Sequence, residues 1–503
     1  MEPLNLSLKP ELKNNLPVKV VQFGEGNFLR GFLDWMLKKL NDAQLFNGSV
    51  LAVQPTPSGR VMPKLKAQDF LYTTILHQLK DNVESEEIVV NNVISAGVNP
   101  YEEDGWRALK QAFTSADLQF VFSNTTEAGI AYSQEEFNLD KAGLSFPGKL
   151  TALLYERFKF YKAKSAVHSG GLSILPCELL EDNGAKLRDL VLQYATDWQL
   201  EDEFKAYVKE DCIFYNTLVD RVVSGYPKAT ETEYRNKLGY IDNLMVFGED
   251  FHFMAIEGDD RIKEQLPFAR LGLNVVVADD IGPYRLRKVR ILNGAHTANV
   301  PAAFLAGLDT VDEMMSSKLT GPFVHDVLYD EIIPAVNLDK GMLTEFADAV
   351  VKRFSDPSMH HQLSAILMNC SSKMKSRVLP TILDARSKGV LPLRLCLSLA
   401  AYIRLYKDVK PGDTSVTVSR ANDKSGEFKD DVNAIEALAK AWSFYAKSEA
   451  TAQLTVKSVL SNVSLWGQDL SSDIDLSAMT AKLLHAICSD GIATTIQAVE
   501  GRH

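Results

Sequence analysis

A pair of glycines, Gly24 and Gly26, lies between a strand-like run and a helix-like run and constrains the fold more than any other feature. The run before them, Val18 to Phe23 (VKVVQF), is β-branched and apolar, which favours a strand. After them, apolar residues recur at helical spacing: Phe28, Leu29, Phe32, Trp35, Met36 and Leu40. A strand, a glycine turn and a helix in this order predict a nucleotide-binding βα unit.

The two glycines have separate physical roles in such a turn. Gly24 permits the tight bend, and Gly26 lets backbone N–H groups approach a pyrophosphate at the start of the helix. The position of the usual third glycine is occupied by Leu29. A glycine-rich turn that binds no ligand is therefore the alternative interpretation.

The second strand candidate, Val50 to Val53, does not reveal which dinucleotide is bound. It is followed by Gln54 and Pro55 rather than by the acid that usually binds the ribose hydroxyls. Arg60 is compatible with a 2′-phosphate, and equally with an arginine in a solvated loop. The residues alone leave NAD and NADP open.

The chain of 503 residues divides into two parts of different character. Up to about residue 280, short strand candidates alternate with longer segments, which indicates a parallel sheet with helical crossovers. These candidates are Val18 to Phe23, Val50 to Val53, Ile88 to Val90, Gln119 to Phe122 and Leu172 to Leu175. We predict an α/β, Rossmann-type nucleotide-binding domain at 17–275 and a mostly α-helical domain at 276–490.

Helical patterns dominate the second part. They cover Tyr284 to Val300, Val324 to Ile333, Leu343 to Phe354, Leu393 to Tyr406 and Val432 to Ala446. The polar stretch from Asp408 to Asp431 reads as a solvated loop, because apolar helical patterns resume after it.

Composition excludes several classes of function. The net charge is −11 and no basic block is present, which argues against a nucleic-acid partner. We find no signal peptide and no run of roughly 18 apolar residues that would span a bilayer. Five widely spaced cysteines without CxxC pairs, and the adjacent His360 and His361, favour a cytoplasmic protein with reduced thiols and no metal site. The oligomeric state stays open.

Residues that can transfer a proton or bind an oxygen atom lie at the start of the helical part. On a regular helix, with about 100° per residue, His296 and Asn293 lie roughly 80° and 140° from Lys288. Arg285 lies about 60° from Lys288 on the same side. A buried lysine trades a proton near neutral pH, and Asn and His can hold an alcohol or carbonyl oxygen. A structural helix with mixed polar residues is the alternative.

Several short motifs follow one another along the chain. They are Gly24-Glu25-Gly26-Asn27-Phe28-Leu29-Arg30; Ser123-Asn124-Thr125-Thr126-Glu127; Phe214 to Ser224 around Val219-Asp220-Arg221; Lys288-x4-Asn293-x2-His296; and Arg353-Phe354 with Pro357, then Ser371-Ser372-Lys373. In this order they resemble the motifs of the mannitol dehydrogenase family of long-chain, metal-independent polyol dehydrogenases. The resemblance extends from about residue 17 to 490.

This resemblance implies an NAD-binding Rossmann domain, a helical domain and an active site between them. Lys288 would be the general acid/base, Asn293 and His296 would orient the reacting oxygen, and Lys373 would line the substrate site. The cofactor-binding residues that it implies are Phe23, Gly24, Gly26, Asn27, Phe28, Asn124, Thr126 and Glu127.

Two departures from the family pattern indicate a branch. The oxyanion-stabilising Asn of the polyol enzymes is replaced by Leu179, with Asn183 a few residues on as a weak substitute. The Glu three residues before the catalytic Lys is here Arg285. Both departures resemble the branch that reduces D-tagaturonate to D-altronate with NADH in hexuronate breakdown. Because a buried carboxylate needs a partner, we predict that Arg285 binds the carboxylate of the uronate.

Three other functions compete with this one. D-fructuronate reduction and mannitol-type polyol oxidation use the same family chemistry on other substrates. A nucleotide-binding sensor that has lost the chemistry is the alternative from a different class. The presence of Lys288, Asn293 and His296 together argues against the sensor.

Overall fold

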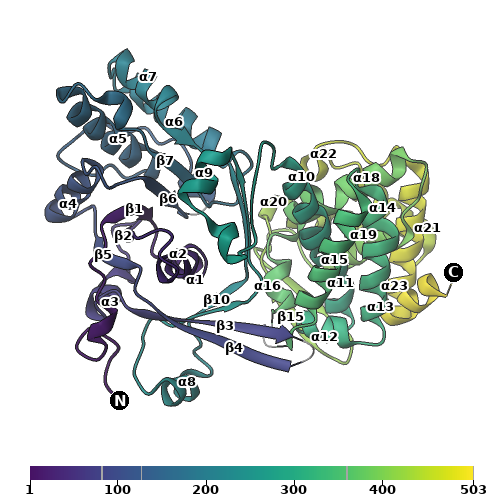
Figure 1. Cartoon of the computed structure of the whole chain (residues 1–503). Helices are drawn as coiled ribbons and strands as arrows, with labels where there is room; N and C mark the ends of the chain where they lie inside the picture. The colour runs from purple at the N-terminus through teal and green to yellow at the C-terminus, as the bar shows by residue number, and fades with distance from the viewer. Residues whose placement is uncertain (81–82, 126, 358–360, 502–503) are drawn as a thin grey trace. The chain divides into compact units, whose positions relative to one another are not determined.

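The computed structural model describes residues 1–80, 83–125, 127–357 and 361–501. The chain forms two compact units, Met1–Ile281 and Gly282–His503, and each is described by itself (Figure 1). Among the described residues, no helix combines the length and apolar character needed to cross a membrane.

The first unit is built on a six-stranded parallel sheet. Its strand order is β5 (Ile94–Val98), β2 (Ser49–Val53), β1 (Val18–Phe23), β6 (Phe120–Ser123), β7 (Ser173–Pro176) and β8 (Ile213–Phe214). The order reverses between β1 and β6, which is where α/β sheets of this kind bind their ligands. The predicted Rossmann-type sheet is therefore confirmed.

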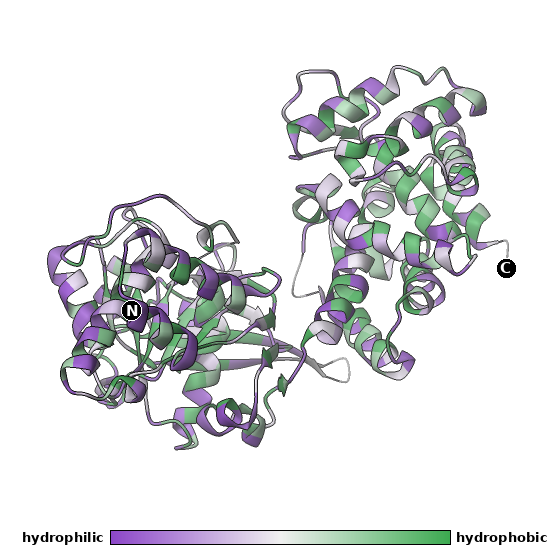
Figure 2. Cartoon of the chain, turned by 90° about the horizontal axis from the view of Figure 1, so that it is seen from above, coloured by the Kyte–Doolittle hydropathy of each residue, from purple (hydrophilic) through white to green (hydrophobic). Residues whose placement is uncertain are grey.

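Helices cover both faces of this sheet. Val20 packs with the apolar side of α1 (Asn27–Gly31) and α2 (Leu33–Asp42) on one face. Val21 and Phe23 point to the other face, which is covered by α4 (Glu103–Phe113), α5 (Phe146–Ala163), α6 (Asn183–Asp197) and α7 (Asp202–Glu210). Burial on both faces explains why these strands read as continuous apolar runs (Figure 2).

Two further sheets complete the first unit. One contains β10 (Val223–Gly225), β11 (Val246–Glu249), β3 (Tyr72–Lys80) and β4 (Val83–Asn91), and the other contains β13 (Val275–Ala278), β12 (Phe253–Glu257) and β9 (Thr217–Asp220). The remaining helices are α3 (Met62–Ala67), α8 (Glu231–Leu238) and α9 (Asp260–Gln265).

The strand predicted at Ile88 to Val90 exists but does not belong to the parallel sheet. It lies in β4, which pairs antiparallel with β3 as a hairpin. An antiparallel pair can leave one face of its strands open to solvent, and Ile88 of this run is exposed. Strand β3 was not recognised in the sequence, so the hairpin connection was missed.

Two buried motif arginines fix α1 against the second sheet. Arg30 donates hydrogen bonds to three oxygens: Glu25 O at 3.0 Å, Leu244 O at 2.6 Å and Asn27 Oδ1 at 2.7 Å. Arg221 donates to Gly31 O at 2.8 Å, Glu249 O at 2.9 Å and Asp250 O at 3.0 Å, and its guanidinium lies 4.2 Å from the Trp35 ring centre. Both side chains therefore stabilise the main chain around α1.

The second unit is mostly helical. Its helices are α10 (Gly282–Arg287), α11 (Gly294–Leu305), α12 (Val311–Ser316), α13 (Thr320–Asp326), α14 (Ile333–Ala335), α15 (Lys340–Phe354), α16 (Leu363–Leu367), α17 (Cys370–Lys373), α18 (Leu379–Ser387), α19 (Leu393–Leu405), α20 (Val432–Trp442), α21 (Glu449–Leu460), α22 (Val463–Trp466) and α23 (Ile474–Glu500). Within the described part of this unit, three π-helical segments interrupt the α-helices: η5 (Lys288–Asn293), η6 (Val327–Ile332) and η8 (Met374–Val378).

The stretch from Asp408 to Asp431 is not simply a loop. It contains an antiparallel hairpin of β14 (Val416–Ser419) and β15 (Ser425–Phe428). Val416 and Val418 are buried, while the residues between and after them are exposed. The segment therefore has the alternation of buried and exposed residues that is typical of a half-buried strand, although its overall composition is polar.

The arginine contacts generate a stability prediction. Replacing Arg221 by Met leaves three carbonyl oxygens without their donor, so we expect the free energy of unfolding to fall by about 3 kcal/mol or more. Urea titration followed by circular dichroism measures the loss. The matched control is Arg107→Met, because Arg107 is exposed on α4 and forms a surface ion pair with Asp104. Equal midpoints for the two variants would contradict the structural role of Arg221.

Candidate active site

The glycine turn lies at the carboxyl end of β1 and has room for a close ligand. Gly24 adopts φ +124°, and a Cβ atom on it would lie 3.0 Å from the carbonyl oxygen of Asn124. A Cβ on Gly26, the residue that precedes α1, would meet open space among the described residues. The N–H groups of the first turn of a helix have no partner within that helix. These features fit a pyrophosphate at the turn.

Main-chain hydrogen bonds align the strand ends around this turn. Gly24 N donates to Val53 O at 3.0 Å, Asn124 N donates to Phe23 O at 3.0 Å, and Cys177 N donates to Ser123 O at 2.7 Å. The carboxyl ends of β2, β1, β6 and β7 therefore form one continuous edge.

The structure brings four of the eight predicted cofactor residues directly to this edge. Gly24, Gly26, Asn27 and Asn124 lie directly on it. The Phe23 ring packs into the core 4.9 Å from Phe146, and the Phe28 ring stacks on Phe32 at 5.0 Å. Thr126 lies outside the described residues, and Glu127 begins the short helix η2 (Glu127–Gly129).

Glu178 supports the edge and was missed in the sequence. Its buried carboxylate accepts hydrogen bonds from Ser123 Oγ at 2.9 Å, Thr125 N at 2.8 Å and Thr125 Oγ1 at 2.9 Å. Burial raises the pKa of Glu178, and these hydrogen bonds oppose the rise. Its signal was its place directly before Leu179, in the segment Pro176-Cys177-Glu178-Leu179.

Asn183 does not take over the role lost at Leu179. Its amide nitrogen donates to the carbonyl oxygens of Pro176, Glu178 and Thr217, and its Oδ1 accepts from the N–H groups of Gly184 and Thr217. The Leu179 side chain is exposed. Because the Asn183 amide is committed to the main chain, it is a structural residue.

The end of β2 holds no acid, as the sequence indicated. The buried Gln54 side chain donates to Thr56 O at 2.7 Å and so organises the following loop. Arg60 is exposed and has no side-chain partner within the part of the chain that the structure describes. Geometry at β2 therefore leaves the choice between NAD and NADP open.

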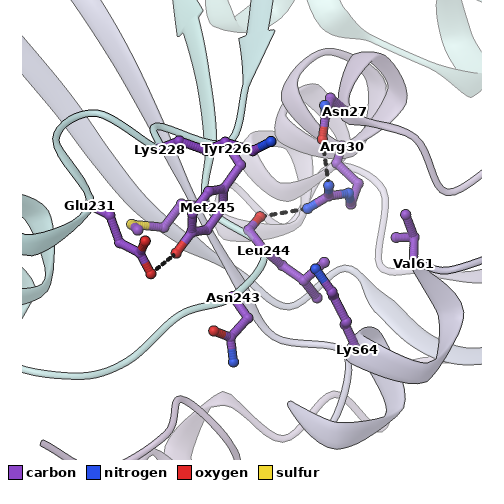
Figure 3. Close-up of a pocket in the computed structure, with 10 residues that line it drawn as sticks. All are labelled: Asn27, Arg30, Val61, Lys64, Tyr226, Lys228, Glu231, Asn243, Leu244 and Met245. Atoms are coloured by element: carbon purple, nitrogen blue, oxygen red, sulfur yellow. Dashed lines mark hydrogen bonds between the residues drawn. The ribbon is translucent and has the colours of Figure 1, made fainter.

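A cavity of about 620 Å³ opens beside the glycine turn (Figure 3). Asn27 and Arg30 of α1 line one side of it, and the side chains of Lys64 and Lys228 extend toward it. Neither lysine ammonium has a hydrogen-bond or ion-pair partner among the described residues. The cavity thus adds positive charge next to the turn, which favours an anionic ligand nearby.

The segment with Lys288 and Asn293 is not a regular α-helix. It is the π-helical segment η5, in which each N–H bonds to the carbonyl five residues earlier. Lys288 and Asn293 therefore lie about one turn apart along the helix. Because the turn holds an extra residue, everything after it is rotated by roughly 100° relative to everything before it.

This extra residue corrects the regular-helix geometry. His296 comes to roughly 20° from Lys288, and Asn293 to roughly 40°. Arg285, which precedes η5, moves from about 20° to about 80° away from His296. The π turn thus gathers Lys288, Asn293 and His296 on one face and turns Arg285 away from His296.

His296 lies between two rings. It stacks on Phe354 with 3.8 Å between ring centres and an interplanar angle of 10°, and meets His361 edge-on at 5.6 Å. Its Nε2 is buried, with no hydrogen-bond partner in the described part of the chain. Burial, followed by the neighbouring His361 and the positive charge of Arg353, holds the pKa of His296 well below its usual value. His296 is therefore neutral at pH 7.

Lys373 lies near this imidazole. Its Nζ donates to Ile366 O at 2.8 Å, and burial followed by nearby Arg377 lowers its pKa. Ser371 of the S-x-K motif is buried and donates from Oγ to Asp430 Oδ2 at 2.7 Å, so it anchors α17. The second unit thus carries all four residues, with Lys373 near His296 and with Lys288 and Asn293 on η5.

Comparison with known proteins gives concordant results for both units. Residues 18–269 match the mannitol dehydrogenase Rossmann domain, and residues 280–488 match the mannitol dehydrogenase C-terminal domain. The altronate oxidoreductase of Halalkalibacterium halodurans is 39% identical over 489 residues, covering 97% of this chain and 94% of that protein. The altronate oxidoreductase of Bacillus subtilis is 39% identical over 482 residues, covering 96% and 95%.

Two solved structures share the fold. A ternary complex of Pseudomonas fluorescens mannitol 2-dehydrogenase with NAD and D-mannitol has a TM-score of 0.70 and 20% identity, covering 97% of this chain and 95% of that one. D-Sorbitol dehydrogenase in its substrate-free form has a TM-score of 0.77 and 19% identity, covering 98% and 100%.

The environment of His296 predicts an unusual titration. The neutral imidazole should persist well below pH 6.5, whereas exposed His168, whose pKa is raised by Asp211, should protonate above pH 6.5. Because the unfolded chain binds the His296 proton more readily, the stability contributed by the neutral ring is present above pH 6.5 and is lost as pH falls. Histidine ring NMR, with His296→Gln for assignment, measures both values. A His296 pKa at or above that of His168 would refute this description.

Proposed function

This chain belongs to the mannitol dehydrogenase family, and we propose that it is an NADH-dependent tagaturonate reductase that interconverts D-tagaturonate and D-altronate. The curated altronate oxidoreductases match it over nearly the whole chain. The observation that carries the proposal is the face formed by Lys288, Asn293 and His296 at η5. We assign cofactor binding to 17–275 and the catalytic residues to 276–490.

The cofactor assignment is supported by the glycine turn. The open space at Gly26, the bend at Gly24 and the N–H groups at the start of α1 suit a pyrophosphate. Asn27, Phe28, Asn124, Thr126 and Glu127 are the remaining proposed contacts, with Phe23 contributing its main chain. When bound, NADH supplies the hydride for the reduction and NAD accepts it in the reverse direction.

The catalytic residues handle the proton and the reacting oxygen. In the reduction, the Lys288 ammonium gives a proton to the oxygen that gains negative charge as the carbonyl is reduced. The Asn293 amide and the unpartnered Nε2 of His296 hold this oxygen in place. In the oxidation, Lys288 takes the proton back from the hydroxyl.

The substrate carboxylate requires a positive partner in the site. Arg285 and Lys373 are the two residues that the sequence nominates, and Lys373 lies near His296. We also propose that the protein acts in the cytoplasm, since Cys177, Cys212, Cys370, Cys396 and Cys488 are all free thiols.

The first test is a substrate panel. NADH absorbance should fall when D-tagaturonate is added, and D-fructuronate, D-fructose and D-mannitol with NAD should react at least tenfold more slowly. Faster reaction with D-fructuronate or with the neutral sugars would replace the proposed substrate. Absence of turnover with all four would favour a nucleotide-binding sensor.

The same assay tests the cofactor. We expect NADH to be preferred over NADPH in kcat/KM. Comparable values for the two cofactors would mean that the missing acid at Gln54 matters and that the NAD assignment is wrong.

A variant of Lys288 tests the proton transfer. Lys288→Ala should lower kcat by about 10² to 10⁴, the usual contribution of a positioned acid, while NADH binding persists. Lys440→Ala is the control, because Lys440 is exposed on α20 and pairs with Glu436. Near-normal turnover in a folded Lys288→Ala protein would remove Lys288 from the mechanism.

A further inference from the structure

We propose that Arg377, acting with Lys373, binds the carboxylate of the substrate and so selects an acidic sugar over a neutral one. The inference rests on the proposed function and assigns a specificity-determining residue to it. The ligand class is a linear six-carbon keto acid whose carbonyl carbon is reduced while its carboxylate is held at a distance from the reacting centre.

The charges around His296 carry the inference. Arg353 on α15, Lys373 on α17 and Arg377 on η8 are the cations that act on this imidazole, whereas the neighbouring His361 is neutral at pH 7 because burial lowers its pKa. Three cations near one partly buried site attract an anionic ligand. Because the cluster surrounds a residue proposed to hold the reacting oxygen, the anion it favours is the substrate.

The backbone holds Arg377 close to the catalytic face. Gly294, the first residue of α11, lies where a Cβ atom would be 3.4 Å from the Arg377 carbonyl oxygen. Gly294 follows Asn293 directly and precedes His296 by two residues. The main chain of η8 therefore packs against the segment that carries the proposed catalytic residues.

Arg377 and Lys373 complement one another in chemistry. Arg377 acts directly on the pKa of Lys373, so their charged groups are close, and Lys373 Nζ is held by its bond to Ile366 O. A guanidinium binds a carboxylate through two parallel hydrogen bonds, which fixes orientation as well as charge. The lysine ammonium retains further donors for the same carboxylate.

Arg285 is less suited to this role than the sequence indicated. The η5 turn rotates Arg285 away from His296, as described above, whereas Arg377 and Lys373 are among the charges that act on His296. Arg285 is therefore the competing partner in the experiment rather than the expected one.

The test compares an acidic and a neutral substrate. We measure kcat and KM of Arg377→Gln, Arg377→Lys and Arg285→Gln with D-tagaturonate and with D-tagatose, a neutral ketohexose. For Arg377→Gln we expect kcat/KM with D-tagaturonate to fall on the order of 30-fold or more, mainly through KM, and kcat/KM with D-tagatose to stay within about threefold. Arg377→Lys should retain part of the preference for the acid.

Controls separate folding from recognition. Lys375→Gln removes an exposed charge from the same η8 segment and should leave kcat/KM unchanged with both substrates. Circular dichroism and NADH fluorescence confirm that each variant folds and binds cofactor. If Arg377→Gln unfolds, the folded Arg377→Lys variant decides the question: a reduced preference for the acid supports the assignment, and an unchanged preference for the acid overturns it.

Two results would overturn the inference. Equal losses on both substrates would make Arg377 a structural residue, and a selective loss in Arg285→Gln alone would place the carboxylate on Arg285. Failure of the wild-type protein on D-tagaturonate would instead count against the proposed function, and the same contrast would then be measured with D-fructuronate.

Discussion

One additional residue in a helical turn controls the geometry of the candidate active site. The π-helical segment η5 begins at Lys288 and ends at Asn293, so these two side chains lie one turn apart instead of on different faces. The same turn brings His296 onto their face and rotates Arg285 away from it. Because a π turn is less favourable than an α turn, it depends on its neighbours. One such neighbour is η8, whose main chain packs against Gly294 at the start of α11.

The first unit depends on a comparable constraint at the glycine turn. Arg30 and Arg221 belong to motifs that resemble functional signatures, yet their guanidinium groups bind mainly main-chain oxygens. They hold α1 between the parallel sheet and the second sheet. Glu178 has the same kind of role at the end of β7, where it fixes Ser123 and Thr125. A motif residue can therefore recur because it positions the ligand-binding main chain without contacting the ligand.

The sequence predicted the parts of the fold whose burial is complete. Strands β1, β2, β6 and β7 are largely buried on both faces, so their apolar runs predict strands without knowledge of the surrounding elements. The hairpins β3–β4 and β14–β15 were missed or misplaced because half of each strand is polar. The π turn was not predictable, since the spacing of apolar residues is compatible with a regular helix. The positive surroundings of His296 could not be predicted either, because Arg353, Lys373 and Arg377 come from distant segments of the chain.

The central claim is that Lys288, Asn293 and His296 form the surface on which the substrate oxygen reacts. A crystal structure of the protein with NAD and D-altronate tests it most directly. We expect the hydroxyl oxygen that is oxidised to lie within about 2.6 to 3.2 Å of Lys288 Nζ, with the Asn293 amide also in hydrogen-bond reach. An altronate bound with this hydroxyl away from Lys288, or a regular α-helix between Lys288 and Asn293, would contradict this role of the three residues.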